Sequence, residues 1–149
     1  PFPAELPQEL KESRAGAFVS IKKYGKLRGC IGTFVPAQQS LAEEIFYNAV
    51  SAAAHDGRFE PIEERELNRL VYSVDVLSTP ESIASAEELD PKVYGVIVKS
   101  VHDNRRGLLL PDLAGIDTAK QQLAVAREKA RIQPKEEVAL ARFTVVRHR

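Results

Sequence analysis

The single cysteine of this 149-residue chain, Cys30, follows an arginine that could change its chemistry. Arg28 precedes it by two positions, so on an extended strand the guanidinium and the thiol share one face. A neighbouring guanidinium favours the thiolate, the nucleophilic form of cysteine. We therefore treat Cys30 as a candidate nucleophile or acid and Arg28 as a candidate anchor for an anionic ligand. The alternative is a buried, inert thiol, because free cysteine is among the most buried residue types.

A reactive cysteine needs a general base, and the sequence offers only scattered histidines. His55 is a weak candidate, because side chains that are adjacent along the chain, such as those of His55 and Asp56, rarely point together. The remaining histidines are His102 and His148. One cysteine and three dispersed histidines do not have the spacing of metal ligands, so no metal site is predicted.

The segment Asp56-Gly57-Arg58 is a second candidate for ligand binding. Asp-Gly favours a turn, from which the Arg58 side chain would project. Asp56 and Arg58 are therefore candidate binding residues, with a structural ion pair that fixes the loop as the alternative. Gly29 and Gly32 are candidates too, because glycine inside a strand often marks the close approach of a ligand or another backbone.

Two stretches of the chain share one pattern and would position these residues. Residues 16–32 and 95–110 each begin Gly-x-x-Val, alternate into a polar turn and then reach Arg-Gly. The turn signals, Tyr24-Gly25 and Asp103-Asn104, are typical of hairpins. In this alignment Cys30 corresponds to Leu108, and Gly32 corresponds to Leu110. Because Gly32 has no side chain, we expect open space in the first half at the position that a leucine side chain fills in the second half.

Helical patterns and closing strands follow both hairpins. Ser40-x-x-Glu43 is a capping-box signature, and Asp117 is the expected N-cap of the second helix. Closing strands are expected over residues 70–77 and 139–146, with a short helix near residues 86–89. The sequence therefore predicts one α+β domain over residues 1–149, with β-β-α-β repeats at about 16–77 and 95–147. Chance similarity of two common hairpin–helix units is the alternative.

The composition narrows the class of protein. The formal net charge is +0 and aromatic residues make up 7%, which argues against nucleic-acid binding. Residues 60–90 carry nine acids and two arginines, whereas residues 120–149 carry eight Lys or Arg and three acids. Such blocks of charge are typical of solvated protein faces, or of contact between the acidic and the basic block. One cysteine, no long apolar run and no signal peptide predict a cytoplasmic protein. The chain begins at Pro1 without Met, so we expect its natural N-terminus further upstream.

Several segments together resemble the AMMECR family: LRGCIG, SLAEEIFYNAVSAAAHDGRFEPI, YSVDVL, YGVIV and RGLLLPDL. The resemblance covers about residues 16–148 and implies an α+β fold with two repeats around a single barrel-like, mainly antiparallel sheet, with helices outside. Residues 27–32 match the LRGCIG signature in full, and the D-x-R-F-x-P segment matches at residues 56–61. The chain departs from the family in lacking a helix before the first strand and in having Arg131 where Gly is common, which makes a left-handed helix end less favourable.

The resemblance implies no established activity, so two hypotheses of different class stay open. In the first, the LRGCIG segment lines a cleft that binds a small anionic ligand or supports cysteine-assisted catalysis. In the second, the domain is a non-catalytic interaction module that acts with Memo-type or radical-SAM proteins, which accompany some prokaryotic family members. Neither hypothesis requires a cofactor.

Overall fold

The structure is a computed structural model that describes residues 2, 3 and 5–149. The chain divides into two compact units. Unit 1 comprises Pro1–Leu77 and Val146–Arg149, and unit 2 comprises Ser78–Val145. The expected single domain over residues 1–149 stays a prediction, and each unit is described by itself.

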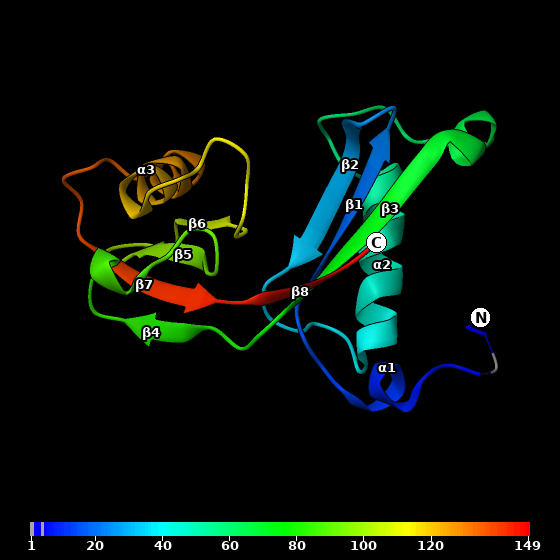
Figure 1. Ribbon diagram of the computed structural model, residues 1–149, viewed down its shortest axis with the longest axis horizontal. Helices are drawn as coiled ribbons and strands as arrows, with labels where there is room; N and C mark the ends of the chain where they lie inside the picture. The colour runs from blue at the N-terminus through cyan, green and yellow to red at the C-terminus, as the bar shows by residue number, and fades with distance from the viewer. Residues whose placement is uncertain (1, 4) are drawn as a thin grey trace. The chain divides into compact units, whose positions relative to one another are not determined.

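Unit 1 contains a four-stranded sheet with the strand order β2-β1-β3-β8 (Figure 1). Its elements are α1 (Gln8–Glu12), β1 (Ala17–Lys23), β2 (Lys26–Thr33), α2 (Leu41–Ala54), the 3-10 helix η1 (Glu64–Arg69), β3 (Leu70–Leu77) and β8 (Val145–His148). The expectation that no helix precedes the first strand is wrong, because α1 lies there. The predicted strand over residues 70–77 is confirmed as β3.

The hairpin between β1 and β2 turns at Tyr24-Gly25, as predicted. Tyr24 and Gly25 both have positive φ, 51° and 76°, which is the geometry of a two-residue turn matched to the twist of the strands. The register then shifts by one residue: Lys22 pairs with Leu27, but Ile21 pairs with Gly29. Arg28 is therefore the extra, unpaired residue of a β-bulge.

Helix α2 covers one face of this sheet. The Ser40 hydroxyl caps the helix by accepting the Glu43 N–H at 3.2 Å. Val19 and Ile21 of β1 pack with Ala52 of α2 in the core of unit 1. A Cβ at Gly29 would lie 2.2 Å from the Ala52 carbonyl oxygen, so only glycine allows β2 to approach the helix this closely.

Unit 2 contains a second four-stranded sheet with the order β4-β7-β5-β6. Its elements are β4 (Glu81–Ile83), the 3-10 helix η2 (Ala86–Glu88), β5 (Gly95–Ser100), β6 (Arg106–Leu109), α3 (Ala119–Ala130) and β7 (Val138–Phe143). The predicted short helix is confirmed as η2. Helix α3 packs on this sheet through a core that includes the side chains of Val96, Val98 and Ala126.

Three sequence predictions in the second half need correction. The N-cap of α3 is Thr118, not Asp117, because the Thr118 hydroxyl accepts the Gln121 N–H and completes a capping box. Helix α3 does end left-handed, at Arg131 with φ 59°, where the Arg131 carbonyl accepts Nη1 of Arg105 at 2.6 Å. The single strand expected over residues 139–146 is two strands, β7 and β8, separated at Thr144.

The α+β class and the antiparallel pairing are confirmed. The expected single barrel-like sheet is not: residues 2, 3 and 5–149 form two four-stranded sheets, with no closed barrel among them. Both sheets place a hairpin beside the strand that follows the helix, and an internal repeat stays a prediction. No helix in the described part of the chain is long and apolar enough to cross a membrane.

Candidate functional site

The bulge at Arg28 decides which way Cys30 faces. Without it, the turn register would pair Cys30 with Val19 and direct the thiol toward the core beneath α2. A slip of one residue moves every side chain beyond it to the other face of the sheet. With the bulge, Cys30 pairs with Ser20, and Gly29 faces the helix instead.

Cys30 belongs to a polar row on the sheet face opposite α2. Cys30 pairs with Ser20 on β1, and Ser20 pairs with Ser73 on β3. The Cys30 Sγ lies 3.3 Å from the Ser20 Oγ, and either group can donate the hydrogen bond. The thiol is half-buried. We call Cys30, Ser20 and Ser73 the polar row.

Asp56 and Arg58 bind the backbone of Cys30 at the open edge of β2. The Cys30 N–H donates to Oδ2 of Asp56 at 3.0 Å, and Nη2 of Arg58 donates to the Cys30 carbonyl at 3.2 Å. Since β2 is the edge strand of its sheet, these groups would otherwise lack a neighbouring strand. The two side chains thus replace a strand and fix the Cys30 backbone.

Asp56 and Arg58 also form a forked ion pair. The Arg58 Nη2 lies 2.7 Å from the Asp56 Oδ2, and Nε lies 3.0 Å from Oδ1. The hydrogen bond from Arg58, with those from the backbone of Cys30 and Arg58, holds the pKa of Asp56 well below its usual range. The carboxylate in turn raises the pKa of Arg58. The Arg58 side chain is nevertheless 59% exposed, so it can also contact an anion from solvent.

The guanidinium of Arg28, the predicted anchor for an anionic ligand, is hydrogen-bonded within the protein. Its Nε and Nη2 donate to both carboxylate oxygens of Glu66 at 3.0 and 3.1 Å, and Nη1 donates to the Glu60 carbonyl at 2.7 Å. The alternation that would place Arg28 on the face of Cys30 is interrupted by the bulge, which redirects its side chain. Arg28 therefore braces the segment before β3, and Arg58 is the exposed cation beside Cys30.

Glu66 is a residue of this region that the sequence reasoning did not select. Its carboxylate also accepts Nζ of Lys23 and the Glu63 N–H, both at 2.9 Å. The hydrogen bond from Arg28, then those from Glu63 and Lys23, hold the pKa of Glu66 well below its usual range. Its signal in the sequence was its place just before a strand, where a carboxylate can reach the neighbouring strand ends.

The other candidates occupy different environments. Gly32 is not open as expected, because a Cβ there would lie 2.0 Å from the Phe18 ring, which fills that space. The weak candidate base His55 is an exposed residue at the C-cap of α2. Across the described ranges, no group of three or more His, Cys, Asp or Glu side chains is placed to hold a metal.

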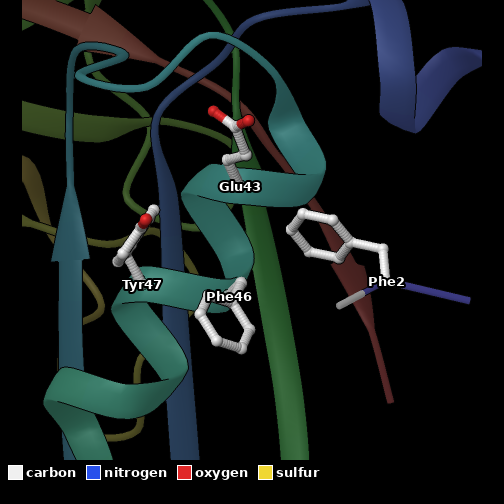
Figure 2. Close-up of a pocket in the computed structure, with 4 residues that line it drawn as sticks. All are labelled: Phe2, Glu43, Phe46 and Tyr47. Carbon is white, nitrogen blue, oxygen red and sulfur yellow. The ribbon is translucent and has the colours of Figure 1, made fainter.

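A small pocket in unit 1 lies on the outer surface of α2. It has a volume of about 210 Å³ and is lined by Phe2, Glu43, Phe46 and Tyr47 (Figure 2). The Phe2 ring meets the Phe46 ring edge-on at 5.6 Å, which holds Phe2 against the helix. This pocket does not include any residue of the LRGCIG segment.

Unit 2 contains a counterpart of the polar row with different chemistry. Gly107 of β6 faces the Ala126 carbonyl of α3, as Gly29 faces that of Ala52. The residue after Gly107 is Leu108, which pairs with Ile97, and Ile97 pairs with Ala141. The row that is thiol and hydroxyls in unit 1 is therefore entirely apolar in unit 2.

Comparison with known proteins finds relatives by sequence and one similar solved structure. Residues 2–148 match the AMMECR1 family model. A protein of Thermotoga maritima is 51% identical over 97% of this chain and 83% of its own length. One of Clostridium acetobutylicum is 48% identical over 99% of this chain, which spans 31% of that relative. The crystal structure of an uncharacterised protein from Pyrococcus horikoshii superposes with a TM-score of 0.87 at 31% identity, covering 97% of this chain and 77% of that one. The chain belongs to the AMMECR1 family.

Proposed function

We propose that the polar row is a binding site for a small carboxylate, with Cys30 available to add to an electrophilic carbon of the ligand. The observation that carries this proposal is the contrast between the two units. In unit 2 the paired residues of the same row, Leu108, Ile97 and Ala141, are all apolar. Unit 1 instead presents a half-buried thiol and hydroxyls beside an exposed guanidinium.

Arg58 supplies the electrostatic part of this site. Its Nη2 already contacts the Cys30 carbonyl, so an anion bound to the exposed edge of the guanidinium would lie close to Cys30. Because Nε and Nη2 already donate to Asp56 and Cys30, Nη1 is the part of the guanidinium that would donate charge-assisted hydrogen bonds to a ligand carboxylate. Asp56 holds the Arg58 side chain in place.

The thiol supplies the chemical part. Addition to a ligand carbonyl would form an Sγ–C bond while the C=O π bond opens, and the thiol proton would move to the new oxygen. Ser20, 3.3 Å from Sγ, can accept that proton and pass it on through its own hydroxyl. The step needs no metal or redox partner.

The test uses pyruvate, which carries a carboxylate beside a carbonyl, with acetate as the control that lacks the electrophile. In amide NMR spectra of the full chain, both ligands should shift the Cys30 and Arg58 signals in a saturable way. Only pyruvate should form a Cys30 adduct, detected by its carbon resonance and lost in Cys30→Ser. Arg58→Gln should abolish the shift of the Cys30 signal, and Arg58→Lys should retain part of it. Equal shifts in Arg58→Gln, or none in the native protein, would overturn the proposal.

A second candidate function is docking to a protein, for which α2 provides the observation. Phe46, Tyr47 and Val50 are large apolar side chains of this helix that are 43–52% exposed. Neighbouring exposed apolar side chains are a feature of interaction sites. In this proposal the domain acts with a Memo-type or radical-SAM protein, and Tyr47→Lys should abolish co-purification of the two while Cys30→Ala leaves it unchanged.

A further inference from the structure

A groove runs along the outer surface of α3 in unit 2, in a part of the chain that the proposed function does not use. Its volume is about 670 Å³, within the range of ligand and peptide sites. One side is the helix, and the other is the segment that follows it. Its lining includes Lys120, Leu123, Ala124, Arg127, Arg131 and Pro134. We call this feature the α3 groove.

The wall of the α3 groove is held in place before any ligand arrives. The Ile132 N–H donates to the Arg127 carbonyl at 2.9 Å, which turns the chain back along the helix. The guanidinium of Arg127 donates from Nη1 to the carbonyls of Gln133 and Glu136, at 2.8 and 3.1 Å. A preformed wall lowers the entropy cost of binding, so the groove is suited to hold a ligand.

Arg131 combines backbone strain with a place in the α3 groove. Its φ of 59° is the left-handed conformation that favours glycine, and glycine would satisfy the same helix end. Its backbone N–H bonds to the helix, and its carbonyl accepts Nη1 of Arg105. Neither contact requires a side chain. The backbone contacts therefore do not explain why an arginine with an exposed side chain occupies this strained position, and we look for a function of the side chain.

The charges of the α3 groove suggest that role. Three of its lining residues are cationic, Lys120, Arg127 and Arg131, and one is anionic, Glu128, which leaves a net charge of +2. Lys120 lies in the first turn of α3 and Arg131 directly after its last residue, eleven positions apart, which is about 16 Å at the helical rise. Leu123 and Ala124 lie between them and provide apolar surface.

We propose that the α3 groove binds an acidic amphipathic segment of a partner protein. The apolar side chains of the segment would contact Leu123, Ala124 and Pro134, and its carboxylates would pair with Lys120 and Arg131. A small anionic molecule would satisfy only one of these two distant cations. A peptide of about three helical turns reaches both. This inference is independent of the polar row in unit 1.

The experiment uses two synthetic peptides of twelve residues made of leucine and glutamate. In one, leucines repeat at helical spacing and form one face; the other has the same composition in scrambled order. Fluorescence anisotropy with the full chain in 50 mM salt should show saturable binding of the first and much weaker binding of the second. Equal binding of both would mean charge attraction alone and would overturn the proposal, as would no binding of either.

Variants locate the binding site. Lys120→Glu should weaken binding of the amphipathic peptide, and Arg131→Gly should do so while favouring the left-handed helix end, so poor folding cannot explain the loss. We expect about a two- to fivefold increase in Kd for each, as for exposed ion pairs. Lys135→Glu, an exposed lysine outside the groove lining, is the matched control and should bind as the native chain does. Unchanged binding in both groove variants would overturn the assignment to this groove.

Discussion

The hairpin–helix part of unit 1 and that of unit 2 are built alike but differ in one row of side chains. In both, a glycine of the edge strand lies against a helix carbonyl, Gly29 against Ala52 and Gly107 against Ala126. In both, an arginine forms a forked pair with a glutamate just before the closing strand, Arg28 with Glu66 and Arg105 with Glu136.

The difference begins with the residue after the glycine. Cys30 and its neighbours in unit 1 are polar, whereas Leu108 and its neighbours are apolar. The edge contacts differ too: Asp56 and Arg58 bind both polar groups of the Cys30 backbone, whereas Lys129 donates to the Leu108 carbonyl. The contacts of Arg28 and Gly29 have counterparts in unit 2, so we assign these two residues a role in the fold. Cys30 and Arg58 have no such counterparts, so we place the proposed binding function there.

The largest expected effect tests the shared part. Gly29→Ala and Gly107→Ala should each destabilise the chain by about 3 kcal/mol, because the new methyl would press on helix backbone that cannot move aside. Chemical denaturation measures the free energy of unfolding. Gly57→Ala is the control, since nothing lies within 4 Å of its Cβ, and it should change stability by less than about 0.5 kcal/mol. A tolerated Gly107→Ala would break the correspondence between the units.

The two arginine–glutamate pairs predict a matched response to acid. The pKa values of Glu66 and Glu136 are both lowered in the folded protein by hydrogen bonds from arginine. Their stabilisation is therefore present above the ordinary value of 4.5 and is lost as the pH falls below it. Glu66→Gln and Glu136→Gln should each be less stable at pH 7 and lose less stability between pH 6 and pH 3 than the native chain. An unchanged slope in either variant would contradict the pairing.

Substitutions in the row that differs between the two units should have unequal effects on the free energy of unfolding. Leu108→Ala should destabilise the chain by about 2 kcal/mol, because it removes a half-buried packing side chain. Cys30→Ala removes a smaller group with one weak hydrogen bond and should cost about 1 kcal/mol or less. Thermal or chemical unfolding of the two variants makes the comparison. A larger loss for Cys30→Ala would mean that the thiol is mainly a core residue.

The smallest expected effect concerns the helix ends, which also differ between the units. Helix α2 ends at His55 with a negative φ, whereas α3 ends at Arg131 in the left-handed conformation. Arg131→Gly should therefore stabilise the chain by about 0.5 to 1 kcal/mol. Denaturant unfolding measures this, and a loss of stability would show that the arginine side chain contributes to the native fold.

Much of this organisation follows from local sequence signals. Tyr24-Gly25 predicted the hairpin turn, Ser40 the helix start and residues 70–77 the closing strand. The bulge at Arg28 was not predicted: a glycine in a strand, such as Gly29, often marks a bulge, but it marks close approach of a ligand or another backbone equally well. The bulge sets the register of the hairpin. Two contacts therefore depend on it: the pairing of Cys30 with Ser20 and the hydrogen bonds of Arg28 with Glu66.

The sequence indicated Arg58 as a candidate binding residue, but its contact with Cys30 was not predicted, for a related reason. Its distance from Cys30, 28 positions along the chain, is bridged only when the loop after α2 returns to the edge of β2. Sequence spacing favoured Arg28 as the cation near the thiol. Tertiary structure gives that place to Arg58 and directs Arg28 into the scaffold.

The most direct test of this account is the ratio of Cys30 alkylation rates by iodoacetate, which is anionic, and iodoacetamide, which is neutral. The ratio cancels differences in exposure and reports the charge beside the thiol. We predict a ratio about two- to fivefold higher in the folded chain than in urea, retained in Arg58→Lys and reduced to the urea value in Arg58→Gln. A ratio that is the same in the native chain and in Arg58→Gln, or a thiol that reacts with neither reagent until urea is added, would contradict the account.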